Sequence, residues 1–165
     1  MNLQIRKAGA SDFTAIWSIF HSVAAGGETY AYDPETTRQQ ARVIWMEVPA
    51  ATFVAEQAGT VVGTYYIKAN QPGLGSHVCN CGYMVAEAAR GKGVATRMCE
   101  HSQREAVSMG FKAMQFNLVV ATNEGAIRLW RRLGFAIVGT LPRAFRHRRY
   151  GFVDALVMYK WLEGE

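Results

Sequence analysis

A short glycine-rich run in the middle of the chain has the composition of an anion-binding turn. Residues 90–95 read Arg-Gly-Lys-Gly-Val-Ala and directly follow a segment rich in β-forming residues. A turn that opens a helix presents unpaired N–H groups at the positive end of the helix dipole, and glycine lets a bulky anion approach the backbone. The run lacks the spacing of the P-loop and of the Rossmann fingerprint. It predicts a site for a phosphate or pyrophosphate, with a plain tight turn as the alternative.

Two asparagines interrupt segments that otherwise have the content of strands. Asn80 lies within residues 77–85, and Asn117 lies within residues 113–120. Buried amide groups need hydrogen-bond partners. The two asparagines therefore predict a polar site beside these strands, and the alternative is a structural role in which they only stabilise the fold.

Three potential metal ligands alternate along the first of these segments. The side chains of His77, Cys79 and Cys81 lie on one face of a strand, but a fourth ligand is lacking and the spacing matches no common zinc site. We expect no metal. We expect the cysteines to be buried, small apolar side chains that catalysis does not need. Their odd number, three in the chain, favours a reducing, cytoplasmic compartment over a disulfide framework.

A basic segment near the C-terminus raises nucleic-acid binding as a rival function. Residues 143–150 read Arg-Ala-Phe-Arg-His-Arg-Arg-Tyr, and the whole chain carries 18 Lys and Arg against 13 Asp and Glu. One basic loop without a recognition helix or a zinc motif is weak support for that function, because it equally suits a cofactor phosphate or a substrate carboxylate. We expect no nucleic-acid partner.

The length and composition of the chain limit the kind of fold that can position these residues. A chain of 165 residues has the size of one domain, so we expect a single domain over residues 1–165. Half of the residues are hydrophobic, which excludes a disordered or collagen-like chain. The N-terminal residues lack the features of a signal peptide, and no apolar run approaches the ~18 residues that cross a bilayer. We expect no association with a membrane.

Alternating apolar residues predict strands, and apolar residues spaced by three and four predict helices. The expected strands are residues 3–6, 51–57, 60–69, 77–85, 113–120, 135–139 and 152–160. The expected helices are one capped by Ser11 that ends near residues 26–27, one introduced at Asp33 that runs through Trp45, one that begins at residue 94, and one over residues 123–133. The candidate anion site therefore has the order strand, glycine turn, helix.

With these elements in order, the chain resembles the GCN5-related N-acetyltransferases (GNAT). Residues 90–95 match the family's Q/R-x-x-G-x-G/A motif, and the segment from Asn123 to Gly134-Phe135 resembles its downstream motif. The order of elements is also that of the family. The resemblance implies an α/β, GNAT-like single domain with a mixed, mostly antiparallel sheet of about seven strands flanked by four helices. Strands four and five would splay apart.

The resemblance implies acetyl-CoA as the cosubstrate, held between strands four and five. In the family, the backbone of strand four pairs with pantetheine and the glycine turn holds the pyrophosphate. The cofactor-binding residues that this implies are Met84, Val85, Arg90, Gly91, Lys92, Gly93, Val94, Ala95, Asn123 and Trp130. We expect direct transfer to an amine in a ternary complex, because no Cys/His or Ser/His pair supports a covalent intermediate.

Two catalytic groups that are common in the family are missing from this chain. Many members carry a tyrosine where this chain has Trp130, whose indole N–H does not act as an acid. The alternative for Trp130 is a core aromatic residue. Strand four also lacks the glutamate that often serves as a general base. Glu28, in the loop of residues 27–32, is the candidate base, with an ordinary surface carboxylate as the alternative.

The acceptor is suggested by resemblance to particular branches of the family. Asn80, Asn117 and Asn123, with residues 27–30, resemble the fungal acetyltransferases of azetidine-2-carboxylate, and residues 151–154 resemble the tail of phosphinothricin and methionine sulfoximine acetyltransferases. This implies that Asn80 and Asn117 act in catalysis by holding a small-molecule amine, an amino acid or its analogue. The alternatives are a protein or peptide N-terminal acetyltransferase and a non-enzymatic acyl-CoA or nucleic-acid binding module. A homodimer is expected from the family alone.

Overall fold

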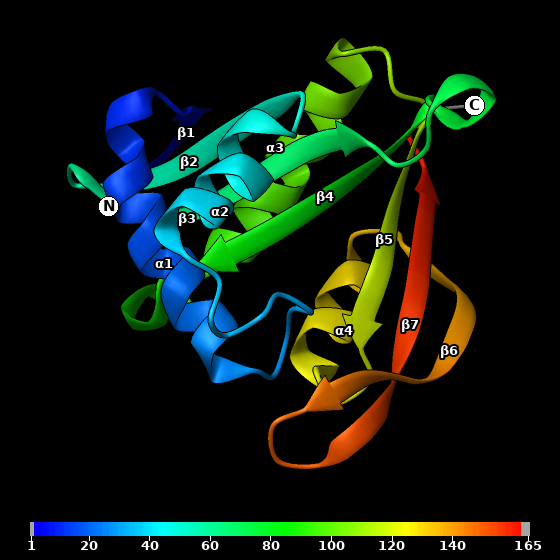
Figure 1. The fold of residues 1–165 in the computed structure, drawn as a ribbon. Coiled ribbons are helices and arrows are strands. Elements are labelled where there is room, and N and C mark those ends of the chain that lie inside the picture. Colours follow the sequence, from blue (N-terminus) through cyan, green and yellow to red (C-terminus); the bar gives the residue numbers. More distant parts are fainter. Residues whose placement is uncertain (1, 163–165) are drawn as a thin grey trace.

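Seven strands form one mixed sheet in the computed structural model, which describes residues 2–162. The strands are β1 (Leu3–Lys7), β2 (Ala51–Gln57), β3 (Thr60–Ala69), β4 (Val78–Val85), β5 (Ala113–Val120), β6 (Ala136–His147) and β7 (Gly151–Trp161). Their spatial order is β1-β2-β3-β4-β5-β7-β6, and every neighbouring pair is antiparallel except β4 and β5, which run parallel (Figure 1). This sheet confirms the expected fold class.

Four α-helices cover the two faces of the sheet (Figure 1). They are α1 (Phe13–Gly26), α2 (Arg38–Arg42), α3 (Val94–Ser108) and α4 (Glu124–Arg132), and a π-helical turn over Val43–Glu47 continues α2. Because successive side chains of a strand point to opposite faces, the sheet contributes to two cores. Tyr66 and Met84 pack with α1, whereas Tyr65 and Tyr83 pack with α3. No helix within residues 2–162 is long and apolar enough to cross a membrane.

Helix α1 illustrates how the sequence determines one of these layers. Its buried residues are Phe13, Ile16, Ile19, Phe20 and Ala24, a spacing that gives the helix one apolar face. Gly27 ends the helix in the left-handed conformation, with φ of 63°, which glycine adopts without steric cost. The loop that follows Gly27 turns back toward the sheet and supplies one wall of the candidate site.

Strands β4 and β5 pair only at one end. Cα register pairs join Val78 to Ala113 and Cys79 to Met114, and no pair follows along the rest of the two strands. Figure 1 shows the two strands diverging from this point. The expected splay of strands four and five is therefore confirmed, and it opens a gap in the middle of the sheet.

The second helix begins later than the sequence analysis predicts. The Asp33 carboxylate accepts the N–H of Glu35 at 2.8 Å, which forms a turn rather than a helix start. Helix α2 begins at Arg38 because Thr37 and Gln40 form a capping box, in which each side chain accepts the other residue's backbone N–H. The chain offers two cap signals in succession, and the second one determines the structure.

Two other predicted boundaries are also wrong. Ser11 does not cap α1: it lies in a short 3₁₀ turn, and the helix begins after Asp12, whose carboxylate accepts the Gly9 N–H at 2.7 Å. The basic segment is not a loop through most of its length, because β6 continues to His147. A shift of register between Leu141 and Phe145 lets the strand continue past the predicted end.

Candidate functional site

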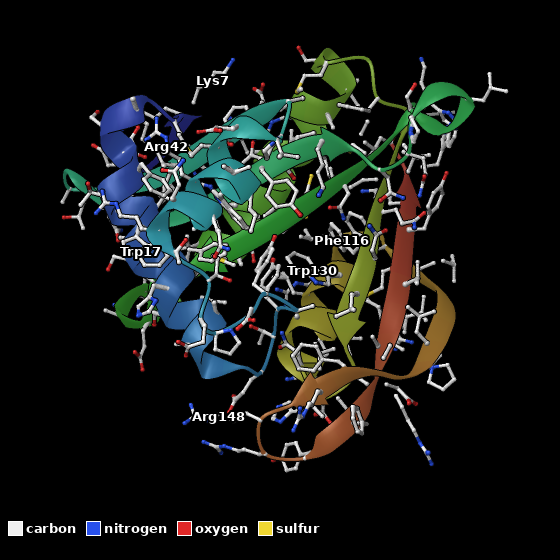
Figure 2. The ribbon with its side chains drawn as sticks, viewed as in Figure 1. Lys7, Trp17, Arg42, Phe116, Trp130 and Arg148 are labelled. Atoms are coloured by element: carbon white, nitrogen blue, oxygen red, sulfur yellow. The ribbon has the colours of Figure 1, made fainter. Side chains whose placement is uncertain are left out.

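A cleft of about 970 Å³ occupies the gap between β4 and β5. Its walls come from the loop after α1, from β3, β4 and β5, from the turn before α3, and from α4. Figure 2 shows Phe116 and Trp130 beside the gap. The cleft brings together most of the residues that the sequence analysis singles out: Glu28, Asn80, Met84, Val85, Arg90, Gly91, Ala95, Asn117, Asn123 and Trp130.

The edge of β4 turns hydrogen-bonding groups toward the gap at every second residue. Hydrogen-bonded pairs alternate along an antiparallel ladder. The Ala86 N–H donates to the Val62 carbonyl at 2.9 Å, so the backbone N–H and C=O groups of the even-numbered residues of β4 face β3. The N–H and C=O groups of Tyr83 and Val85 therefore face β5. Of the two strand residues predicted to bind the cofactor, Val85 offers its backbone to the gap, whereas Met84 turns its backbone to β3.

Tyr30 supplies the partner that Tyr83 loses when the strands separate. The Tyr83 N–H donates to the Tyr30 hydroxyl at 2.7 Å, and that hydroxyl donates to the Tyr83 carbonyl at 2.8 Å. The ring of Tyr30 stacks on Tyr32, with centroids 5.6 Å apart. The two tyrosines therefore fix the loop after α1 against the open edge of β4.

The glycine turn before α3 has the geometry of an anion site. Gly91 and Gly93 have φ of 71° and 79°, and a Cβ at either position would meet no other atom within 4 Å. Within residues 2–162, no acceptor is bonded to the N–H groups of residues 91–95. Helix α3 is 15 residues long and has no side-chain cap. Open space, unpaired donors and a helix dipole converge on one spot, and this fits a pyrophosphate.

The residues of this turn differ in where their side chains lie. Arg90, Gly91 and Ala95 line the cleft. Lys92 is directed elsewhere, and its ammonium group donates to the Ala88 carbonyl at 2.8 Å. Val94 is buried in the core under α3. Lys92 and Val94 can therefore contribute their backbone N–H groups to an anion, whereas their side chains serve the fold.

Helix α4 forms the wall opposite α3. Asn123 caps this helix, and its side chain accepts the Ala126 N–H at 3.3 Å. Trp130 is 9% exposed and packs against Tyr83 and Phe116, with ring centroids 5.2 and 5.0 Å away. Trp130 thus belongs to the core and to the cleft wall at once, because its aromatic neighbours line the same gap.

Asn80 joins β3 and β5 across the cleft floor. Its Oδ1 accepts the Tyr66 hydroxyl at 3.0 Å, and its Nδ2 donates to the Gln115 carbonyl at 3.0 Å. Asn80 is 7% exposed, so these bonds satisfy an otherwise buried amide. Asn117 is exposed, and its Nδ2 donates to the Asn70 side chain at 2.7 Å. Both asparagines line the cleft as predicted, but Asn80 also holds the splayed strands together.

Sequence reasoning assigned no role of their own to three tyrosines and a lysine from β3 and the loop after α1. Tyr30, Tyr32, Tyr66 and Lys68 all line the cleft. Burial raises the pKa of each of the three tyrosine hydroxyls, so they remain protonated at neutral pH. The sequence gives little indication that these tyrosines belong to a site, because Tyr30 and Tyr32 lie in a loop and Tyr66 looks like an ordinary strand residue. These hydroxyls can donate hydrogen bonds but cannot act as bases.

Glu28 lies at the mouth of the cleft and is already paired. Its carboxylate lies 3.2 Å from the Arg149 guanidinium, and the Arg148 N–H donates to the Gly27 carbonyl at 3.1 Å. These contacts join the loop after α1 to the β6–β7 hairpin, on which Figure 2 shows Arg148. A smaller cavity of about 200 Å³ lies beside this junction. Of the basic segment, only Arg148 lines the main cleft within the described chain.

The three cysteines are free and buried. Burial raises the pKa of the Cys81 thiol well above its ordinary value, and it raises that of Cys99 to about 11. The thiolate is the nucleophilic form of cysteine, so neither side chain is activated at neutral pH. Within residues 2–162, no group of three or more His, Cys, Asp and Glu side chains is arranged to hold a metal ion.

Comparison with known proteins agrees with this geometry. Residues 13–135 match the profile of the acetyltransferase (GNAT) family. N-acetyltransferase aca1 of Schizosaccharomyces pombe is 36% identical over 148 residues, which cover 79% of this chain and 71% of that protein. The structure of a GCN5-related N-acetyltransferase from Kribbella flavida is 46% identical, with a TM-score of 0.92 over 97% of this chain and 98% of that one. A phosphinothricin acetyltransferase from Sinorhizobium meliloti, solved in complex with AcCoA, shares the fold at 20% identity, with a TM-score of 0.87 over 98% of this chain and 89% of that one.

Proposed function

The chain belongs to the acetyltransferase (GNAT) family, and from this premise we propose that it transfers an acetyl group from acetyl-CoA to the amine of a small amino acid or amino-acid analogue. Acetyl-CoA is the cosubstrate of this family, and it supplies an acyl group activated as a thioester. The observation that carries the proposal is the glycine turn before α3. The N–H groups of residues 91–95 are unpaired within the described chain, and Gly91 and Ala95 of the same turn line the cleft.

The residues around the turn suit the parts of the cosubstrate. The N–H groups of residues 91–95 would hold the pyrophosphate at the positive end of α3, whereas the Arg90 N–H, included in the predicted set, already donates to the Glu87 carbonyl at 3.2 Å. The backbone of Val85, which faces the gap, would pair with the pantetheine arm. Asn123 and Trp130 would form the opposite wall, where α4 begins and packs. Met84 would contribute through packing, because its backbone faces β3.

Direct transfer is favoured over a covalent enzyme intermediate. Cys81 lines the cleft, but burial keeps its thiol protonated, and the described chain offers no other activated nucleophile there. The acceptor amine must therefore attack the acetyl group itself. Both substrates would have to be bound at the same time, which is the ternary complex that the sequence analysis expects.

The pKa of the acceptor amine determines how much the reaction needs a general base. A peptide-like α-amine with a pKa near 8 is neutral in roughly a tenth of molecules at pH 7, whereas a lysine-like amine near 10.4 is neutral in far fewer. Glu28 remains the proposed base, and it would need to accept the amine proton while paired with Arg149. A free amino acid keeps its carboxylate, which raises the pKa of its amine above the peptide value, so a base that accepts the amine proton is still needed.

Charge in the cleft supports the same acceptor class. The acids that line the cleft within the described chain are Glu28, which is paired, and Glu87, which precedes the glycine turn. Asn80 and Asn117 supply amide groups on the opposite side of the gap. A polyamine would call for several unpaired carboxylates, whereas amide donors suit a carboxylate beside the amine.

A thiol-release screen tests this function. The purified protein is mixed with acetyl-CoA and, one at a time, azetidine-2-carboxylate, methionine sulfoximine, phosphinothricin, spermidine, an aminoglycoside and a peptide with a free N-terminus. We expect the highest kcat/KM among the first three. A clear preference for spermidine, the aminoglycoside or the peptide would contradict the amino-acid acceptor and leave the acetyltransferase assignment standing.

We further propose a homodimer that works in a reducing, cytoplasmic compartment. Three free, buried cysteines suit such a compartment. Val138 on β6 and Phe152 on β7 are 59% and 68% exposed, and an interface between two copies of the chain would cover such side chains. Sedimentation equilibrium at micromolar concentration tests the dimer, and a monomer there would contradict it.

A further inference from the structure

A row of polar side chains crosses three strands where the cleft opens. Lys68 of β3 lies directly opposite Asn80 of β4 in the antiparallel register, so their side chains are neighbours on the same face of the sheet. Asn80 reaches the Gln115 carbonyl of β5, and the Gln115 side chain donates to Asn117 at 2.9 Å. Asn117 donates in turn to Asn70, just after β3. The row lies on the side of the gap away from α3 and its glycine turn.

Lys68 is the cation of this row, and no carboxylate neutralises it. Its ammonium group lies 5.2 Å from the centroid of the Tyr66 ring, and no Asp or Glu within residues 2–162 forms an ion pair with it. Lys68 is half-buried and lines the cleft. Arg149 is different, because its charge is met by Glu28. An unpaired ammonium group in a cleft attracts an anionic group of a ligand.

The amides beside Lys68 complete a binding site for a negatively charged group. An amide nitrogen carries two N–H donors. Asn80 and Asn117 each use one of them in a hydrogen bond to another residue of the protein. The ammonium group of Lys68 adds further donors. A carboxylate presents two oxygens that accept several such bonds. The row therefore matches a carboxylate in charge and in the direction of its hydrogen bonds.

We propose that Lys68 is a specificity-determining residue that binds the carboxylate of the acceptor, with Asn80 and Asn117 beside it. The inference rests on the proposed function, and it names the group by which that function selects amino acids over simple amines. The carboxylate end of the acceptor lies on the β3 side of the gap. The amine is thereby directed toward the open edge of β4, where Val85 and Tyr83 turn their backbones outward.

Arg148 is the rival cation. It also lines the cleft, but it is exposed and belongs to the β6–β7 hairpin, where its N–H is bonded to Gly27. No backbone register places Arg148 beside Asn80 or Asn117. Arg148→Met therefore serves as the matched control for Lys68→Met, because both changes remove one positive charge from the lining and retain an unbranched apolar chain.

The test compares each acceptor with its own carboxamide, which keeps the amine and removes the negative charge. For Lys68→Met, we expect kcat/KM for the amino acid to fall by about 10- to 100-fold, mainly through KM, because a bond to a charged group is lost. The value for the carboxamide should stay nearly constant. Lys68→Arg should recover most of the activity, Lys68→Glu should prefer the carboxamide, and acetyl-CoA affinity measured by calorimetry should not change.

A second measurement needs no variant. The deaminated form of the acceptor, a carboxylic acid without the amine, should inhibit the wild-type protein competitively with the acceptor. An equal loss for acid and carboxamide in Lys68→Met, a selective loss in Arg148→Met, or the absence of this inhibition would overturn the assignment of Lys68. If the wild-type protein acetylates only amines that lack a carboxylate, the proposed function itself fails and the Lys68 site fails with it.

Discussion

The Tyr30 hydroxyl forms hydrogen bonds with both backbone groups of Tyr83, although the two residues are 53 positions apart. Tyr83 lies on the part of β4 that has no partner in β5. A single side chain thus replaces the strand that has moved away, and it uses the strand edge that an extended ligand would also use. The loop after α1 and the pantetheine arm of the cosubstrate are therefore expected to meet at Tyr83.

Removing this hydroxyl tests the relationship. Tyr30→Phe leaves the N–H and C=O of Tyr83 without their partner, which should lower the free energy of unfolding by about 1–3 kcal/mol. If acetyl-CoA binds along the same edge, the loss should be smaller in its presence. Thermal unfolding with and without saturating acetyl-CoA measures both values. Tyr32→Phe is the control, because Tyr32 stacks on Tyr30 and its hydroxyl interacts with Tyr66 of β3 rather than with the backbone of Tyr83. Equal losses in the two states would show that bound cosubstrate does not reach Tyr83.

The glycine turn makes a separate prediction for the cosubstrate. Gly93→Asp places a negative charge at the proposed pyrophosphate site, where a Cβ meets nothing within 4 Å in the protein itself. We expect the fold to survive and the Kd for acetyl-CoA to rise by about 10- to 100-fold through charge repulsion. Isothermal titration calorimetry measures the change.

Two controls separate charge from backbone strain in that experiment. Gly93→Asn has the same shape without the charge, and asparagine tolerates the left-handed conformation. Gly110→Asp places the same side chain at another positive φ, 92°, also in open space, but after the other end of α3. Gly93→Asp should bind acetyl-CoA most weakly of the three. Unchanged affinity in Gly93→Asp would remove the turn from the site and with it the main support for the proposed function.

The sheet and the cosubstrate side of the cleft could be predicted because their signals are local. Strands β2, β3 and β5 have the predicted bounds, since alternation and turn residues determine them within a few positions. The glycine turn was recognisable for the same reason. The start of α2 was missed because two cap signals, at Asp33 and at Thr37, follow each other. A local pattern does not show which of the two begins the helix in the folded protein. The extent of β6 was missed because a bulge hides the alternation that marks a strand.

The acceptor side could not be predicted because it depends on long-range register. Nothing local distinguishes Lys68 from a surface lysine, and only the pairing of β3 with β4 sets it opposite Asn80. The same holds for Tyr30, which acts through a strand far along the chain. Asn80 was predicted to bind substrate, and its bonds to Tyr66 and Gln115 add a structural role that the sequence analysis held as the alternative.

The two asparagines should therefore respond differently to substitution. Asn80→Ala leaves the Tyr66 hydroxyl and the Gln115 carbonyl without a partner, so the free energy of unfolding should fall by roughly 1–3 kcal/mol. Asn117→Ala removes an exposed side chain and should cost less than about 0.5 kcal/mol. Chemical denaturation measures both values.

Kinetics complete the comparison of the asparagines. Asn117→Ala should lower kcat/KM for the amino-acid acceptor by about 10- to 100-fold, with acetyl-CoA affinity nearly unchanged. The reason is that, of the two substrates, the amide is proposed to contact the acceptor and not acetyl-CoA. A stable Asn117→Ala protein with wild-type kinetics would assign this asparagine to the surface and not to the site.

Cys81 gives the test of direct transfer. Its thiol lines the cleft, but burial raises its pKa well above that of an ordinary thiol, so lowering the pH or working near neutrality leaves it protonated and weakly nucleophilic. Wild-type protein incubated with acetyl-CoA and no acceptor should remain unacetylated by intact mass spectrometry. Cys81→Ala should keep most of the activity, and its kcat/KM should rise with pH in parallel with the wild-type value, because the neutral amine is the form that attacks. Stoichiometric acetylation of Cys81, or a pH profile that shifts in Cys81→Ala, would replace direct transfer with a covalent route.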